Sequence, residues 1–140
     1  MKKKIYANSD LCTGCELCTA ACSVSRFGEN NPKKSGIIIK RDLFERFEIQ
    51  FICRNCEDPP CVDACITGAM QKNDLTGLVK HDSNKCIGCW SCIMICPYDS
   101  IIQSKHESSG RSIALKCDSC PDKEIPPCVV ICPTKALVYE

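Results

Sequence analysis

The stretch Cys86-Ile87-Gly88-Cys89-Trp90-Ser91-Cys92-Ile93-Met94-Ile95-Cys96-Pro97 places four cysteines at the spacing C-x2-C-x2-C-x3-C, followed by a proline. The same cysteine spacing occurs in residues 12–22, and two further groups of four lie in residues 53–65 and 117–132. Both further groups contain Pro-Pro-Cys-Val, so the groups follow the order A-B-A′-B′ of an internal duplication. All sixteen cysteines belong to these groups: Cys12, Cys15, Cys18, Cys22; Cys53, Cys56, Cys61, Cys65; Cys86, Cys89, Cys92, Cys96; Cys117, Cys120, Cys128, Cys132.

The cysteine spacing indicates a metal cofactor. In proteins that bind [4Fe–4S] clusters in pairs, three cysteines of such a run bind one cluster and the fourth binds its neighbour. At four thiolates per cubane, sixteen cysteines predict four [4Fe–4S] clusters. Zinc ribbons also use C-x2-C pairs, but zinc leaves the third and fourth cysteines of each group unexplained. Disulfides need an oxidising compartment and therefore a secretion signal, which the sequence does not indicate.

Composition narrows the class of protein further. Aromatic residues make up only 6% of the 140 residues, so we expect the clusters to replace much of the core and cluster binding to be coupled to folding. A net charge of +1 argues against a nucleic-acid partner. The basic start Met1-Lys2-Lys3-Lys4 is followed by a segment too short and polar for a signal peptide. No stretch approaches the ~18 apolar residues of a membrane span, so we expect a cytoplasmic protein without direct membrane insertion.

Between the cysteine groups the pattern predicts an α+β fold of short strands and short helices. Hairpins are expected over residues 69–82, 101–115 and 37–52, each with apolar runs joined by polar turn residues. Short helical turns are expected after the third cysteine of each group, with no long helix. A proline after the fourth cysteine should end two of them, at Pro97 and Pro133.

The segments around the groups suggest which groups pair. Groups two and three are joined as in a two-cluster ferredoxin unit, by Thr67-Gly68-Ala69-Met70 and then Leu78-Val79-Lys80-His81-Asp82. The corresponding strands for groups one and four lie at the two chain ends, in residues 5–10 and 134–139. We therefore expect two interleaved ferredoxin-like units, an outer unit of residues 1–50 plus 100–140 and an inner unit of residues 51–99. A sequential pairing of one with two and three with four remains open.

The sixteen cysteines and the two Pro-Pro-Cys repeats resemble those of a known family, the four-cluster iron–sulfur subunits of anaerobic oxidoreductases. Its members accompany dimethyl sulfoxide reductase, formate dehydrogenases, hydrogenases, tungsten aldehyde oxidoreductases and carbon monoxide dehydrogenase. The short length is most similar to the ferredoxin-like subunit associated with carbon monoxide dehydrogenase. The chain departs from the family pattern at Lys135, where glycine is usual, and at Ser23 and Ile66, where proline is frequent.

The resemblance also implies how the cysteines divide among the clusters. Four ligand sets are expected, each taking three cysteines from one group and one from its paired group. They are Cys12, Cys15, Cys18 and Cys132 (set one); Cys22, Cys117, Cys120 and Cys128 (set two); Cys65, Cys86, Cys89 and Cys92 (set three); Cys53, Cys56, Cys61 and Cys96 (set four).

The function that these features favour is electron transfer without substrate chemistry. The resemblance implies a low-potential donor enzyme, with carbon monoxide dehydrogenase as the best candidate, and an acceptor such as a hydrogenase or an NAD(P)-reducing flavoprotein. One alternative is the iron–sulfur subunit of a tungsten or molybdenum oxidoreductase acting on an aldehyde or formate. A reductase that acts directly on a substrate would need an open iron site, which sixteen cysteines do not leave. A cluster-storage or scaffold protein is a third option.

Overall fold

Short helices and short strands alternate along the chain in a computed structural model that describes residues 4–45 and 47–140. Lys2 and Lys3 of the basic start lie outside the described residues. The predicted α+β class is confirmed. The elements are β1 (Ile5–Ala7), α1 (Leu17–Phe27), the 3-10 helix η1 (Pro32–Lys34), β2 (Ile38–Asp42), β3 (Phe47–Phe51), α2 (Pro60–Ala64), β4 (Met70–Lys72), β5 (Val79–His81), α3 (Ser91–Ile95), β6 (Ile101–Lys105), β7 (Ser112–Lys116), α4 (Pro127–Ile131) and β8 (Leu137–Tyr139).

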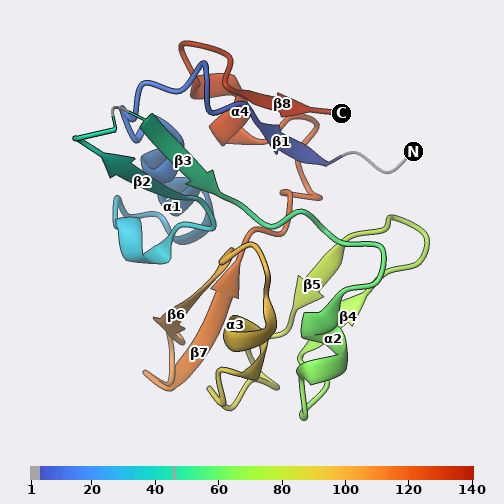
Figure 1. The fold of residues 1–140 in the computed structure, drawn as a ribbon. Helices are drawn as coiled ribbons and strands as arrows, with labels where there is room; N and C mark the ends of the chain where they lie inside the picture. The colour runs from blue at the N-terminus through green and yellow to red at the C-terminus, as the bar shows by residue number, and fades with distance from the viewer. Residues whose placement is uncertain (1–3, 46) are drawn as a thin grey trace.

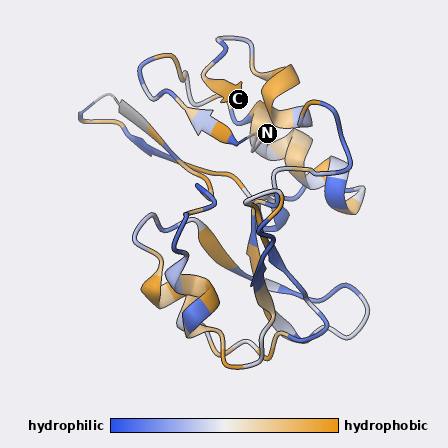
Figure 2. Ribbon diagram, turned by 90° about the vertical axis from the view of Figure 1, so that its right-hand side faces the viewer, coloured by the Kyte–Doolittle hydropathy of each residue, from blue (hydrophilic) through white to orange (hydrophobic). Residues whose placement is uncertain are grey.

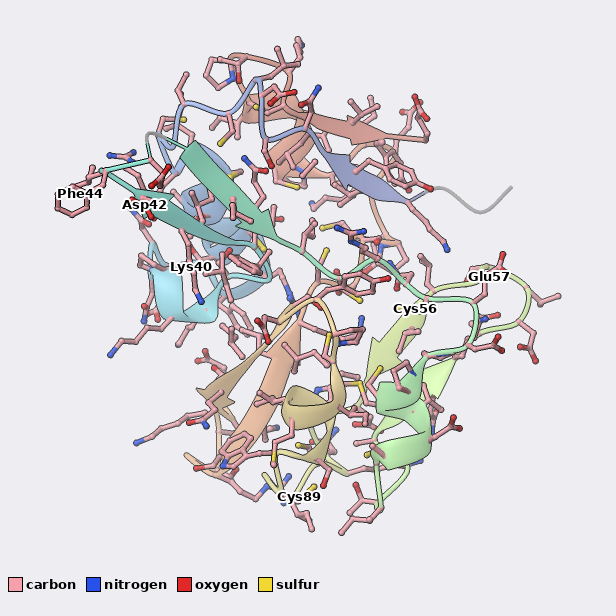
Figure 3. All side chains as sticks on the ribbon, viewed as in Figure 1. Lys40, Asp42, Phe44, Cys56, Glu57 and Cys89 are labelled. Atoms are coloured by element: carbon pink, nitrogen blue, oxygen red, sulfur yellow. The ribbon has the colours of Figure 1, made fainter. Side chains whose placement is uncertain are left out.

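The strands form two-stranded antiparallel sheets: β1 with β8, β2 with β3, β4 with β5, and β6 with β7. All three predicted hairpins are confirmed. Their turns are held by side chains that accept backbone N–H groups, as Asn and Asp do in many turns. Asn73 Oδ1 accepts from Leu75 N at 2.9 Å, and Asp42 Oδ1 accepts from Phe44 N at 2.9 Å. In the turn between β2 and β3 the Phe44 side chain is 97% exposed and points away from the body of the protein (Figure 3).

The two ends of the chain lie side by side, as the sequence predicted (Figure 1). Ile5 is the register partner of Tyr139 in the β1–β8 pair. Backbone hydrogen bonds continue the pairing on both sides, between Lys4 and Glu140 and from Asn8 N to Ala136 O at 2.7 Å. Strands more than a hundred residues apart in sequence therefore close one half of the molecule.

Two hydrophobic clusters occupy two halves of the molecule, drawn above and below one another in Figure 1. In the upper half α1 packs against α4, and in the lower half α2 packs against α3 while β5 contacts β7. Figure 2 accordingly shows hydrophobic segments in both halves rather than one central layer. The upper cluster consists of Ile5, Cys18, Ile37, Ile52, Cys53, Cys117, Cys128 and Leu137, and the lower one of Cys61, Ala69, Met70, Val79, Cys86, Cys92, Ile101, Ile113 and Ala114.

The helices differ in length. Helices α3 and α4 end directly before a cysteine that precedes proline, and a residue in that position is disfavoured from helical geometry. In group one Ser23 replaces that proline, and α1 continues for eleven residues to Phe27, with Gly28 (φ 73°) as its C-cap. In group two Ile66 also replaces proline but α2 ends at Ala64, so the absence of proline permits a longer helix without being sufficient for one. The prediction of no long helix is therefore wrong for group one. Within the described residues no helix has both the length and the apolar composition to cross a bilayer.

Candidate cluster-binding sites

Each cysteine group spans a loop and the helix that follows it. The first two cysteines lie in the loop, and the third is the second residue of the helix, as at Cys18, Cys61, Cys92 and Cys128. The fourth cysteine comes four positions later: Cys22 lies within α1, whereas the fourth cysteines of the other groups directly follow their helices and have an extended backbone. Each group thus holds its third cysteine on a helix, and in three groups the fourth lies where the helix gives way to extended chain.

The residue directly before the second cysteine of each group has a left-handed backbone conformation. The values of φ are 71° at Gly14, 47° at Asn55, 73° at Gly88 and 61° at Ser119. This conformation turns the backbone N–H back toward the first cysteine of the loop. Gly14 N donates to Cys12 Sγ at 3.4 Å, and Ser119 N donates to Cys117 Sγ at 3.3 Å. Such N–H···S contacts stabilise negative charge on a cysteine sulfur.

Two of the expected ligand sets each line one cavity. All four cysteines of set one surround a cavity that Ile39, Gln50 and Leu137 complete. All four cysteines of set four surround a second cavity, which Val79, Pro97 and Ile101 complete. In both cases the set draws on a cysteine from a different group, Cys132 and Cys96 respectively. The fold therefore brings together cysteines that are far apart in the sequence.

Electrostatic effects between thiols agree with the other two expected sets. The main cause of the raised pKa of Cys128 is burial, followed by the thiols of Cys117, Cys22 and Cys120, and then Cys18. For Cys92 the main cause of a raised pKa is burial, followed among the thiols by Cys86, Cys65 and Cys61. The thiols with the largest effect belong to expected set two for Cys128 and to expected set three for Cys92. Cys89 of set three is exposed at the lower end of the molecule (Figure 3), and Cys15 of set one is also exposed.

Burial makes a thiolate without a nearby cation unfavourable at several of these cysteines. Burial raises the pKa of Cys61 and Cys120 to about 11 and that of Cys117 to about 12. Ionised thiolates in these positions therefore need a cation to compensate their charge. Within residues 4–45 and 47–140, no three His, Cys, Asp or Glu residues converge on one ion position. A cubane requires no such convergence, because each of its four irons takes one thiolate, and the donor set fits [4Fe–4S] clusters.

The fourth cysteines of groups two and four have the opposite shift. Burial raises the pKa of Cys65 and Cys132, but hydrogen bonds outweigh it and lower both values. The donors include the hydroxyls of Thr67, 3.6 Å from Cys65 Sγ, and Thr134, 3.7 Å from Cys132 Sγ. Ala136 N also donates to Cys132 Sγ at 3.3 Å. These loops are built to favour the thiolate form of the fourth ligand.

Asn55 is a structural residue of the site that sequence analysis did not identify. It is 1% exposed and connects three segments. Its Oδ1 accepts from Val79 N at 2.9 Å, its Nδ2 donates to Ser119 Oγ at 3.0 Å, and its carbonyl accepts from Lys4 Nζ at 2.7 Å. The available signal was its position, since Asn55 stands where Gly14 and Gly88 stand in their loops.

Comparison with known proteins agrees with this chemistry. Residues 44–140 match the family model described as a 4Fe-4S dicluster domain, and residues 9–25 match a 4Fe-4S binding domain. An iron-sulfur protein of Rhodospirillum rubrum is 36% identical over 153 aligned residues, which cover 95% of this chain and 79% of the relative. The thiosulfate reductase electron transfer subunit PhsB of Salmonella typhi is 31% identical over 139 residues, which cover 91% of this chain and 70% of the relative.

A solved structure is similar in fold. It is the active site complex BamBC of benzoyl coenzyme A reductase with bound benzoyl-CoA, with a TM-score of 0.56 and 24% identity. The match covers 99% of this chain and 78% of the other. Sixteen cysteines and two matched iron–sulfur models fit multiple [4Fe–4S] clusters and are consistent with four. The chain belongs to the 4Fe-4S dicluster domain family.

Proposed function

We propose that this electron-transfer iron–sulfur protein is the subunit of a redox complex that connects a substrate-converting enzyme with an electron acceptor. When bound, [4Fe–4S] clusters supply one-electron oxidation and reduction. The observation that carries the proposal is that the sixteen cysteines fall into four groups of four, enough to bind every iron of four cubanes and to leave no position for substrate on a cluster. The similarity to a subunit named for electron transfer supports the same role.

We infer that ligand sets one to four each bind one cluster and that the chain forms two interleaved units, an outer unit of residues 1–50 plus 100–140 and an inner unit of residues 51–99. Support comes from the cavities lined by sets one and four and from the contacts of α1 with α4 and of α2 with α3. The β6–β7 hairpin lies in the sequence of the proposed outer unit. Its residues Ile101, Ile113 and Ala114 nevertheless belong to the lower hydrophobic cluster, so this hairpin also stabilises the proposed inner unit.

The exposure of the cysteines supports two ends for electron entry and exit. Cys15 of set one and Cys89 of set three are exposed, whereas Cys117 of set two and Cys61 of set four are buried. We infer that sets one and three face the partner proteins and that sets two and four lie between them. Solvent exposure and hydrogen bonds to sulfur then differ along the path, and both properties set reduction potentials.

For the partners, the family resemblance favours carbon monoxide dehydrogenase as the donor and a hydrogenase or NAD(P)-reducing flavoprotein as the acceptor. A tungsten or molybdenum oxidoreductase for an aldehyde or formate is the second candidate, since PhsB is named as a subunit of a reductase. The likeness to the benzoyl coenzyme A reductase complex concerns the fold alone and gives this chain no catalytic role. We propose a cytoplasmic location, with no nucleic acid as partner.

The proposal is tested on anaerobically purified protein. We expect about sixteen iron and sixteen sulfide per chain, and reversible reduction without turnover of any substrate. Zinc in place of iron and sulfide, or substrate conversion by the isolated chain, would contradict it. Reduction by purified carbon monoxide dehydrogenase with carbon monoxide, compared with formate dehydrogenase and formate, separates the two donor candidates.

Double substitutions test the ligand sets. Cys12→Ala combined with Cys132→Ala should remove one cluster, about four iron atoms, because both belong to set one. Cys12→Ala combined with Cys65→Ala should remove two clusters, because these belong to sets one and three. Sequential pairing of the groups predicts the reverse result for the two proteins.

A further inference from the structure

Lys116 is a buried lysine. It ends β7 directly before Cys117, and it is only 2% exposed. Its ammonium nitrogen donates to Cys117 O at 2.7 Å, and its own carbonyl accepts from Arg26 Nη1 at 2.8 Å. Lysine is rarely buried to this degree unless a partner compensates its charge.

No carboxylate in the described part of the chain provides that compensation. The ion pairs within 4 Å among these residues belong to Lys34, with Glu29 and Glu107 as partners. Asp118 and Asp122 line the same cavity as Lys116, but neither has an oxygen within ion-pair distance of its nitrogen. A buried charge without a partner is strongly destabilising. The holoprotein must therefore supply negative charge from another direction.

Cysteines of two different sets lie beside this lysine. The ammonium nitrogen donates to the carbonyl of Cys117, a cysteine of set two, at 2.7 Å. Cys117 belongs to the same hydrophobic cluster as Cys53, a cysteine of set four. The buried ammonium group therefore lies where the two proposed internal cluster sites adjoin.

We propose that the Lys116 ammonium is the shared counter-charge of the set two and set four cluster sites and raises the reduction potentials of both. The inference rests on the proposed function and on its ligand sets. A fixed positive charge stabilises the state with one more electron, and the effect is large in a site screened from water. Reduction adds that electron from the donor and changes no covalent bond.

The test is an anaerobic redox titration of the holoprotein with dithionite, followed by electron paramagnetic resonance. Lys116→Met keeps the length and burial of the side chain and removes its charge. We expect two of the four midpoint potentials to fall and the other two to stay unchanged. Lys116→Arg should keep the two potentials near those of the unmodified protein. Lys80→Met is the matched control, because Lys80 lines the same cavity but is exposed, and all four potentials should stay unchanged.

Unchanged potentials in Lys116→Met, or an equal fall in all four, would overturn the proposal. If the Lys116→Met protein does not retain its clusters, the iron contents of the Lys116→Gln and Lys116→Arg proteins test the proposal instead. Full iron content in the Arg variant with cluster loss in both neutral variants supports the counter-charge, whereas loss in the Arg variant as well overturns it. The unmodified protein tests the proposed function separately. If the proposed function is wrong, the unmodified protein lacks iron; if only the role of Lys116 is wrong, it contains iron but the potentials of the variant do not change.

Discussion

The loops of groups one and three differ from those of groups two and four at one equivalent position. All four adopt a left-handed backbone at the residue directly before the second cysteine, but glycine occupies it in Gly14 and Gly88, whereas Asn55 and Ser119 occupy it in the other two. Glycine adopts this conformation without steric cost, and a residue with a Cβ does not. The two non-glycine residues hydrogen-bond to each other at 3.0 Å.

The difference teaches that the two kinds of loop have different neighbours. The glycine loops each carry an exposed second cysteine, Cys15 or Cys89, and in the group three loop the absence of a Cβ also lets Gly88 lie against the backbone of Ser112. The Asn55 and Ser119 loops meet inside the molecule, where side chains are needed to satisfy buried polar groups. The backbone strain is offset by hydrogen bonds that a glycine could not make.

Removal of the Asn55 side chain should have the largest effect. Asn55→Ala leaves Val79 N–H and Ser119 Oγ without their partners and keeps an unfavourable left-handed residue. At about 1–3 kcal/mol for each lost buried partner, we expect a destabilisation of about 3–5 kcal/mol. Anaerobic chemical unfolding followed by cluster absorbance measures it. Asn55→Gly also removes the hydrogen bonds but relieves the backbone strain, so it should be about 1 kcal/mol more stable than Asn55→Ala. A destabilisation below about 1 kcal/mol in Asn55→Ala would contradict the role of Asn55 in connecting the three segments.

A Cβ added to the glycine loop of group three should have the next largest effect. At Gly88, with φ of 73°, a Cβ would lie 2.6 Å from Ser112 O, so β7 would have to move. Gly88→Ala should therefore cost about 2–4 kcal/mol, from the backbone conformation and the overlap together. Gly68→Ala is the matched control, since its φ is 71° and no atom lies within 4 Å of the added Cβ. It should cost about 1 kcal/mol, and equal melting temperatures for the two variants would exclude the steric part.

The smallest effect is a gain at Lys135. Gly68 and Lys135 are both three residues after a fourth cysteine, and the φ of Lys135 is 59°. Lys135→Gly removes the left-handed penalty but adds freedom to the unfolded chain, so a net stabilisation of about 0.5–1 kcal/mol is expected. Lys135→Ala should give no gain, because it retains the Cβ. Thermal unfolding of both variants measures the difference, and equal shifts would show that the backbone is not responsible.

Sequence reasoning worked where a local rule decides the structure. Asn73 to Gly77 specify a turn by their own side-chain and backbone preferences, so the β4–β5 hairpin was predictable. The pairing of β1 with β8 followed from comparing the segments around the cysteine groups. The length of α1 was not predicted, and the absence of a proline at Ser23 was no sufficient signal, since Ile66 also replaces proline and α2 has only five residues.

The parts of the site that escaped prediction depend on contacts between distant segments. Lys116 follows the apolar residues Ile113 to Leu115 and gives no sign in the sequence that its charge is buried. Asn55 has three hydrogen-bonding partners, at sequence separations of 24, 51 and 64 residues. No local pattern encodes such partners, and the four ligand sets themselves remain predictions.

The adjacency of β1 and β8 bears on the order in which the halves are completed during translation. The lower hydrophobic cluster needs no residue beyond Ala114, so it can close while later residues are still being made. The hydrophobic cluster of the upper half includes Leu137, so it cannot form until the end of this sequence has been made. Strand β1 stays unpaired until then, because its partner β8 lies more than a hundred residues later in the sequence. Domains fold as their residues emerge, and distant pairings form slowly. Iron–sulfur assembly factors would therefore encounter a nascent chain whose first cysteine group is the last to be enclosed.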